Sequence, residues 1–385
     1  MEFDVIILGA GAAGMFAAIE AGRRGRRVLV IDHAARAGEK IRISGGGRCN
    51  FTNLATAPDR FLSANPRFAA SALSRFTPAD FVARLSAAGI AWHEKAAGQL
   101  FCDGSARQVV DWLKAEMAAA GVTLWLETAV EAVAPGFAVA TRRGTVTAPR
   151  LVVATGGKSI PKMGASGLGY RIAEQFGLAL RDTRPGLVPL TFGPQDLAGL
   201  APLAGVAVPA RVTAGRAAFD DALLFTHRGL SGPAILQISS YWREGEGVAI
   251  DLLPGARLRE RLAGVPGRLA LHNALARLVP ERLARAVVEE LGLSGNLADQ
   301  NRAGLERLAA RLHDWRATPT GSEGYRTAEV TLGGVDTAGL DARTMEARAV
   351  RGLHFIGEVV DVTGWLGGYN FQWAWSSGWA AGQAV

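Results

Sequence analysis

The first 32 residues constrain the fold more than any other part of the chain. Four apolar residues at Val5–Leu8 lead into Gly9-Ala10-Gly11-Ala12-Ala13-Gly14, an alanine-rich stretch follows, and a second apolar run occupies Val28–Ile31. Strand, glycine turn, helix and strand in this order predict the βαβ unit of a dinucleotide-binding fold. The first glycine allows a tight turn, the second lets main chain approach a pyrophosphate, and the third lets helix and strand pack closely. We therefore expect a dinucleotide at the start of the helix, where unpaired N–H groups favour an anion.

The end of the second strand supports the same interpretation. Asp32 follows the glycine turn by about 20 residues, the position from which a carboxylate can accept hydrogen bonds from ribose hydroxyl groups. We therefore include Asp32 and the adjacent His33 among the predicted cofactor-binding residues.

The stretch 38–53 indicates which dinucleotide is bound. It contains Ser44-Gly45-Gly46-Gly47-Arg48-Cys49-Asn50, which is too rich in glycine for a regular helix and too polar for a buried strand. We expect a loop that presents its backbone. A nicotinamide enzyme does not require such a loop here, whereas the longer body of a flavin has to be enclosed by main chain and small side chains. The stretch therefore favours FAD, with Lys40 and the Ser44–Asn50 segment as predicted contacts.

Together, the block from Gly9 to Asp32 and the Ser44–Asn50 segment resemble the BaiN-like (YhiN-type) bacterial NAD(P)/FAD-dependent oxidoreductases of the glutathione-reductase-like FAD superfamily. The resemblance extends over essentially the whole chain. It implies an α/β protein with a Rossmann-like, three-layer FAD-binding domain and an inserted domain that is β-barrel-like in one part and helical in the other. The implied boundaries are 1–187 with 320–385 for a discontinuous FAD-binding domain, 188–255 for the β-rich insert, and 256–319 for the helical segment.

The resemblance also implies FAD contacts far along the chain. It places Val130 beside the adenine, Thr155-Gly156-Gly157 at a second nucleotide-contacting turn, and Gly357-Glu358 near the ribityl chain and the pyrophosphate. Gly367-Gly368-Tyr369-Asn370 precedes the last helix, whose free N–H groups can stabilise negative charge on a reduced flavin.

Composition limits the setting and the partners. The 385 residues are 49% hydrophobic, enough for a large core in two or three domains. Only two cysteines are present, which fits a reducing compartment and makes a disulfide framework impossible. The chain starts with a charged residue and a core strand and has no apolar run of membrane-spanning length, so we expect a cytoplasmic protein without a membrane partner. We predict no metal site.

The formal charge of +7 raises the question of a nucleic-acid partner. The arginines near 257–285 fall at helical spacings, as expected for a solvated helix face, and no RNA-binding signature accompanies them. We therefore expect a small-molecule substrate and no nucleic-acid partner.

The resemblance favours NAD(P)H-driven reduction of an activated double bond in a small organic substrate, through non-covalent FAD. Because the chain has only one GxGxxG pattern, the nicotinamide is expected to dock transiently as the electron donor. Two alternatives remain: a flavin-dependent RNA-modification enzyme, and an FAD-binding redox sensor without turnover.

Three residues are candidate proton donors: Cys49, His227 and Tyr369. For His227 an alternative has equal weight. Thr226 and Ser231 can cap a turn and a helix that begins at Pro233, with His227 fixing the loop.

Overall fold

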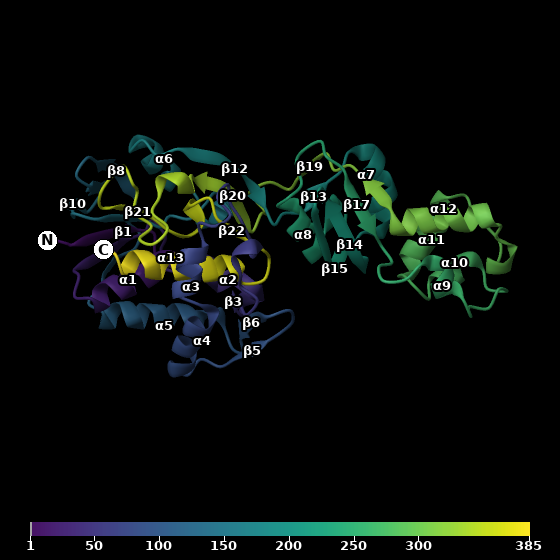
Figure 1. Ribbon diagram of the computed structural model, residues 1–385, viewed down its shortest axis with the longest axis horizontal. Coiled ribbons are helices and arrows are strands. Elements are labelled where there is room, and N and C mark those ends of the chain that lie inside the picture. Colours follow the sequence, from purple (N-terminus) through teal and green to yellow (C-terminus); the bar gives the residue numbers. More distant parts are fainter. Residues whose placement is uncertain (1) are drawn as a thin grey trace. The chain divides into compact units, whose positions relative to one another are not determined.

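The computed structural model describes residues 2–385 and divides into two compact units (Figure 1). Unit 1 contains the chain up to Arg184 and the segment Val330–Val385, and unit 2 is Pro185–Glu329. Each unit has its own hydrophobic core, one made from residues of unit 1 and the other from residues of unit 2. The two cores explain why the chain folds as two units.

Unit 1 is built on a five-stranded parallel sheet with the strand order β21-β11-β1-β2-β7. Its strands are β1 (Val5–Leu8), β2 (Val28–Ile31), β7 (Thr123–Trp125), β11 (Leu151–Val153) and β21 (Leu353–Phe355). The helix α1 (Ala12–Arg23) connects β1 to β2. The predicted βαβ unit and the Rossmann-like α/β fold are therefore confirmed. Strands β1, β2, β11 and β21 are buried at every position, as expected for a parallel sheet covered on both faces.

The last helix, α13 (Tyr369–Gly382), packs closely against α1. A Cβ atom built on Gly378 would lie 2.7 Å from the Ala13 carbonyl oxygen, and one on Gly382 would lie 2.8 Å from that of Ala17. The two glycines therefore permit a backbone approach that any side chain would prevent. Through this packing the carboxyl end of the chain covers the helix that follows the glycine turn.

Smaller elements complete unit 1. Its other strands pair in four further groups: β3 (Asn50–Asn53), β6 (Gln99–Cys102) and β5 (Trp92–Glu94); β8 (Val130–Ala134), β9 (Ala138–Thr141) and β10 (Gly144–Thr147); β4 (Phe61–Leu62) and β22 (Thr363–Gly364); β12 (Leu180–Gly186) and β20 (Val330–Val335). Its other helices are α2 (Glu39–Gly47), α3 (Ala70–Arg75), α4 (Pro78–Ala87), α5 (Ala106–Ala119) and α6 (Leu168–Gln175).

Unit 2 contains one antiparallel sheet of seven strands with the order β18-β17-β14-β15-β16-β13-β19. The strands are β13 (Leu190–Thr191), β14 (Ala207–Ala214), β15 (Ala217–Thr226), β16 (Gly229–Ser231), β17 (Val248–Asp251), β18 (Trp315–Ala317) and β19 (Gly321–Ser322). Both edge strands, β18 and β19, follow the helical segment in the chain. They nevertheless pair with strands that precede it, Trp315 with Ile250 and Gly321 with Thr191. Antiparallel pairing over such separations is set by packing, which local periodicity does not reveal.

The helices of unit 2 are α7 (Pro194–Leu200), α8 (Pro233–Ser239), α9 (Leu258–Leu262), α10 (Leu271–Leu275), α11 (Glu281–Glu290) and α12 (Arg302–His313). Pro280 precedes α11, and Gly292 follows it with a left-handed φ of 61°. No helix among residues 2–385 has both the length and the apolar character needed to cross a membrane.

Candidate functional site

The amino end of α1 has the geometry of a phosphate site. Gly9 has a φ of 109°, and a Cβ atom there would overlap the carbonyl oxygen of Ala154. A Cβ on Gly14 would overlap the carbonyl oxygen of Gly9, so this glycine allows the turn and helix to approach. A Cβ on Gly11 would meet no atom within 4 Å. Gly11 also provides no side chain to cap α1, so no capping side chain satisfies the first N–H groups of the helix.

Asp32 lies directly beside this turn. Its carboxylate accepts a hydrogen bond from the Ala10 amide at 2.6 Å and one from the Ala34 amide at 2.8 Å. Each oxygen keeps a second lone pair for a further donor such as a ribose hydroxyl. His33 Nδ1 is 3.4 Å from the same carboxylate, and the imidazole packs against Gly164.

The glycine-rich stretch is less irregular than expected. Glu39 to Ile43 form a helical turn, and β3 begins at Asn50, so the prediction of a continuous loop over 38–53 is wrong at both ends. The irregular part is Ser44–Gly46, where Ser44 is extended and Gly45 and Gly46 have left-handed φ values of 56° and 66°. Gly47 is also left-handed. The predicted exposed backbone is therefore concentrated in Ser44 to Arg48, between a helix and a strand.

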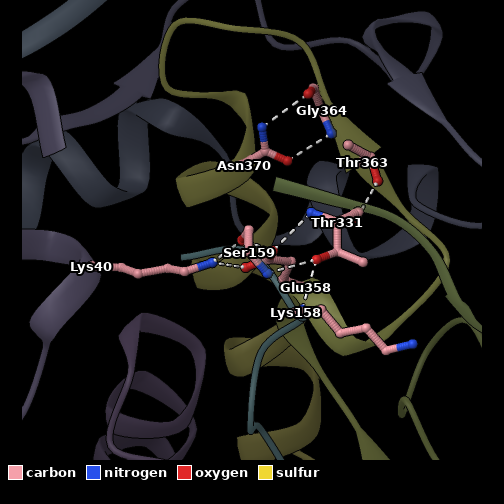
Figure 2. Close-up of polar contacts among 8 residues, drawn as sticks. All are labelled: Lys40, Lys158, Ser159, Thr331, Glu358, Thr363, Gly364 and Asn370. Atoms are coloured by element: carbon pink, nitrogen blue, oxygen red, sulfur yellow. Dashed lines mark hydrogen bonds and ion pairs between the residues drawn. The ribbon is translucent and has the colours of Figure 1, made fainter. Parts of the chain in front are cut away.

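Lys40 joins this segment to the far end of the chain. Its ammonium group donates to Ser159 Oγ and to Glu358 Oε2, both at 2.6 Å (Figure 2). The other Glu358 oxygen accepts from Ser159 Oγ at 2.8 Å and from the Thr331 amide at 2.9 Å. Figure 2 shows Lys40, Ser159 and Glu358 converging from three separate segments.

The network decides the ionisation of Glu358. Burial by itself raises the pKa of this carboxyl group, because the charged form loses hydration. The Lys40 charge and the hydrogen bonds from Lys40, Ser159 and Thr331 outweigh burial, so the pKa of Glu358 lies below its usual value. Glu358 is therefore a fixed negative charge at neutral pH.

The Gly156-Gly157 turn fits around the same network. A Cβ on Gly157 would overlap Thr331 Oγ1 and would lie 2.8 Å from Glu358 Oε1. Thr331 Oγ1 also accepts from the amides of Lys158 and Ser159, at 2.7 Å and 3.1 Å. Within unit 1 this turn approaches Thr331 and Glu358 closely, and its contact with a nucleotide stays a prediction.

Three further predicted residues lie around the same part of unit 1. Gly357 faces α1, because a Cβ there would lie 2.9 Å from the Cβ of Ala13. Thr155 Oγ1 is buried without a hydrogen-bond partner among residues 2–385 and packs against Gly169. Val130 begins β8, shortly after Thr128, whose amide donates to the Asp32 carbonyl oxygen at 2.9 Å. Glycine turn, Asp32 and Glu358 are therefore brought together by the parallel sheet.

Sequence reasoning missed Ser159 and Thr331. Both carry hydroxyl groups close to a predicted glycine turn, Ser159 two residues after Gly157 and Thr331 two residues before Gly333. Their position beside these turns could have marked them as site residues, but their hydrogen bonds with Glu358 depend on tertiary contacts.

The loop before α13 is held by its own residues and by β3. The Asn370 side chain accepts from the Gly364 amide at 2.8 Å and donates to the Gly364 carbonyl oxygen at 2.9 Å (Figure 2). Gly367 and Gly368 have φ values of 108° and 98°, and a Cβ on Gly368 would overlap the Thr52 carbonyl oxygen. Asn50 lies beside Gly368, which brings the end of the first glycine-rich stretch to this loop. No side chain caps α13, so its first N–H groups are also available to an anion.

The three proton-donor candidates occupy different environments. Cys49 has no exposed surface, and burial raises the pKa of its thiol. Tyr369 is 6% exposed, packs against Phe61 and Trp365, and has a pKa raised by burial.

His227 lies in unit 2, exposed in the turn between β15 and β16. Thr226 Oγ1 accepts from the Arg228 amide at 3.3 Å and α8 begins at Pro233, as in the second interpretation, but Gly232 precedes the helix and the predicted cap by Ser231 is wrong. Among residues 2–385, no imidazole contact of His227 holds the turn.

The residues present fit FAD. The uncapped start of α1, the open space beside Gly11 and the acid at the end of β2 form a cradle for a dinucleotide. Over the described range 2–385, no three His, Cys, Asp or Glu side chains are grouped so that they could hold a metal ion.

Residues 3–384 match the model of the family described as HI0933-like protein Rossmann domain. Two relatives have the name ribosomal RNA dihydrouridine synthase. The protein from Escherichia coli (strain K12) is 55% identical and that from Haemophilus influenzae (strain ATCC 51907 / DSM 11121 / KW20 / Rd) is 45% identical, each alignment covering 99% of this chain and 98% of the relative. A 3-dehydro-bile acid delta(4,6)-reductase from Clostridium scindens is 30% identical, with 98% of both chains covered.

Among solved structures, a 3-ketosteroid delta1-dehydrogenase from Sterolibacterium denitrificans has a TM-score of 0.51 at 14% identity, covering 100% of this chain and 99% of that chain. This likeness shows a shared fold. The chain thus has the predicted Rossmann-like FAD-binding fold.

The comparisons correct our expectation about partners. We predicted a small-molecule substrate and no nucleic-acid partner, whereas the two relatives at 55% and 45% identity are named for ribosomal RNA. Our prediction failed because it required an RNA-binding signature, and a catalytic protein can recognise RNA through an arginine-rich surface without one.

Proposed function

Since the chain belongs to the HI0933-like Rossmann family of FAD-dependent oxidoreductase-like proteins, we propose that it reduces uridine to dihydrouridine in ribosomal RNA with FAD as cofactor. The observation that carries this proposal is the 55% identity, over nearly the whole of both chains, to a relative named for that reaction. The relative named as a bile acid reductase is much more distant, at 30%.

The reaction adds two hydrogen atoms across the C5–C6 double bond of the uracil ring. With a nicotinamide as donor, uridine, NAD(P)H and a proton give dihydrouridine and NAD(P)⁺. FAD would supply hydride chemistry at carbon, which no side chain of the chain can provide. The protein has to hold the cofactor, position the base and deliver a proton.

The proposed binding residues divide this work. The α1 N-terminus with Gly11 would receive the pyrophosphate, and Asp32 would accept from the adenosine ribose. Lys40 and Glu358 would fix the exposed Ser44–Arg48 backbone relative to β21. The free N–H groups at the start of α13 would stabilise negative charge on the reduced cofactor.

For the proton we propose Tyr369. A phenol is protonated at neutral pH, burial raises the pKa of Tyr369 further, and the residue occupies the first turn of α13. Cys49 is also protonated but has no exposed surface from which to reach a substrate.

The proposal is tested with the full-length protein and ribosomal RNA purified from cells that lack the gene. The protein should show a flavin spectrum that bleaches anaerobically with NADH or NADPH and recovers when the RNA is added. Nucleoside mass spectrometry should then find dihydrouridine. Reduction of the flavin without dihydrouridine in the RNA would refute the proposed substrate, and failure to bind FAD on reconstitution would refute the proposal as a whole.

A further inference from the structure

Positive charge is segregated within the helical part of unit 2. The stretch 257–277 has five arginines and one acidic residue, Glu260, whereas the stretch 278–319 has six arginines and six acidic residues. The first stretch therefore has a net charge of +4, more than half of the +7 of the whole chain, and the second is neutral.

The two stretches also differ in how their arginines are paired. In the second, Arg285, Arg302, Arg311 and Arg316 form ion pairs of 2.7 to 3.0 Å with Glu281, Glu306, Glu290 and Asp314. Arg282 and Arg307 donate to backbone carbonyl groups. These six guanidinium groups are used inside unit 2.

The arginines of the first stretch have no such partners. Within residues 2–385, no ion pair involves the exposed residues Arg257, Arg259, Arg261, Arg268 and Arg277. The single acid among them, Glu260, accepts from the Arg257 amide at 3.4 Å and so faces the amino end of α9. We call these five residues the arginine surface.

The helix packing explains why the arginine surface faces solvent. Leu258 and Leu262 of α9 are buried, as are Leu271 and Leu275 of α10, and all four belong to the core of unit 2. Arg259 and Arg261 flank the buried leucines of α9, whereas Arg257 precedes α9, Arg268 lies between the two helices and Arg277 follows α10. In Figure 1 the labels α9 and α10 mark the lower side of this helical part and α12 its upper side.

We infer that the arginine surface binds the phosphate backbone of the RNA substrate. Guanidinium groups match phosphate in charge and in bidentate geometry, and unpaired ones need not break an existing ion pair before they bind. The inference rests on the proposed function, because ribosomal RNA is the polyanion that this function requires. Contacts to phosphate hold and orient RNA without reading its sequence, which is the task of a surface outside the cofactor site.

The test compares two full-length variants with equal net charge. One replaces Arg259, Arg261, Arg268 and Arg277 by Ala, and the control replaces Arg285, Arg302, Arg307 and Arg316, whose guanidinium groups have partners inside unit 2, by Ala. Affinity for a fluorescein-labelled, mixed-sequence 30-nucleotide RNA is measured by anisotropy from low to moderate salt. Each lost phosphate contact lowers the slope of log K against log salt by about 0.7 and the affinity at 0.1 M salt by about fivefold.

The first variant is expected to bind more than tenfold more weakly than the wild type with a clearly reduced salt slope, and the control is expected to bind within threefold of the wild type. Both should keep the wild-type FAD content and the wild-type rate of flavin reduction by NAD(P)H. Equal affinity of the two variants would overturn the inference. The inference would also be overturned if the first variant lost affinity for vesicles of anionic phospholipid but kept its affinity for RNA, because the partner of the surface would then be a membrane.

The outcome is separable from that of the proposed function. If wild-type protein forms dihydrouridine and the first variant matches the control in RNA affinity, the arginine surface is refuted while the function stands. If the first variant loses RNA affinity and the wild type forms no dihydrouridine in ribosomal RNA, the surface stands as an RNA site and the proposed reaction falls.

Discussion

Alanine substitutions at Gly11 and at Gly14 should have opposite effects, one on FAD binding and the other on folding. A methyl group at Gly11 would meet no protein atom within 4 Å, and the residue has ordinary extended backbone angles (φ −82°, ψ −172°). Gly11→Ala should therefore change the free energy of unfolding of the FAD-free protein by no more than about 0.5 kcal/mol. At Gly14 the same methyl group would overlap the Gly9 carbonyl oxygen.

Gly11→Ala should instead weaken the binding of FAD. The methyl group occupies the space beside the α1 N-terminus and keeps a pyrophosphate from one or two main-chain N–H groups. A hydrogen bond to a charged group contributes about 1.5–3 kcal/mol, so a loss of about 2–4 kcal/mol is expected. Since 1.4 kcal/mol is a factor of ten, FAD affinity should fall by roughly 30-fold to 1,000-fold.

The assay is a fluorescence titration of FAD-free protein with FAD, together with thermal unfolding of the same samples. Gly11→Ala should lose affinity and keep its midpoint, whereas Gly14→Ala should unfold roughly 3–10 °C lower because overpacking costs about 1–3 kcal/mol. Gly199→Ala is the matched control, since a methyl group at this exposed position of α7 also meets no atom within 4 Å. FAD affinity of Gly11→Ala within threefold of the wild type would refute our placement of the pyrophosphate.

Three further predictions concern the network and the candidate proton donors. Lys40→Met should cost about 1–2 kcal/mol of unfolding free energy at pH 7, because Glu358 loses its cationic partner. The pKa of Glu358 in the folded protein lies below the usual 4.5, so the loss of stability in Lys40→Met should be complete above pH 4.5 and should disappear as the pH falls through the folded-state pKa. A loss of stability that does not change with pH in urea unfolding would contradict the role of the ion pair. Cys49 and Cys102 should resist iodoacetamide at pH 8 in the native protein and react after denaturation, as followed by mass spectrometry, because burial raises the pKa of both thiols, that of Cys102 to about 11. Tyr369→Phe should lower the rate of dihydrouridine formation about 100-fold or more at unchanged FAD content, with Cys49→Ala as the control. Our choice of donor would be contradicted if Tyr369→Phe kept the wild-type rate, or if His227→Gln lost a comparable amount of activity.

Local patterns were sufficient for the elements around the glycine turn. The strands at Val5–Leu8 and Val28–Ile31 have the predicted bounds, because buried parallel strands are continuous apolar runs and glycine punctuates them. The stretch 38–53 was predicted less well. There the glycines concealed a short helix before Ser44 and a strand from Asn50, both of which are stabilised by contacts with distant segments.

The sequence by itself determined the βαβ unit, the acid at the end of β2 and the number of charges in each stretch, because these depend on residues close together in the chain. Tertiary structure alone decided which charges have partners in distant parts of the chain. Lys40 meets Glu358 across 318 positions, and β18 and β19 join a sheet whose central strands precede them by about a hundred residues. Of the arginines in 278–319, Arg311 meets its acid, Glu290, on another helix, whereas Arg285 and Arg302 pair with acids four residues away on their own helices, as the sequence already allows. The physical reason is that periodicity fixes which side of a helix is buried, whereas the groups that face each other are fixed only when the helices pack.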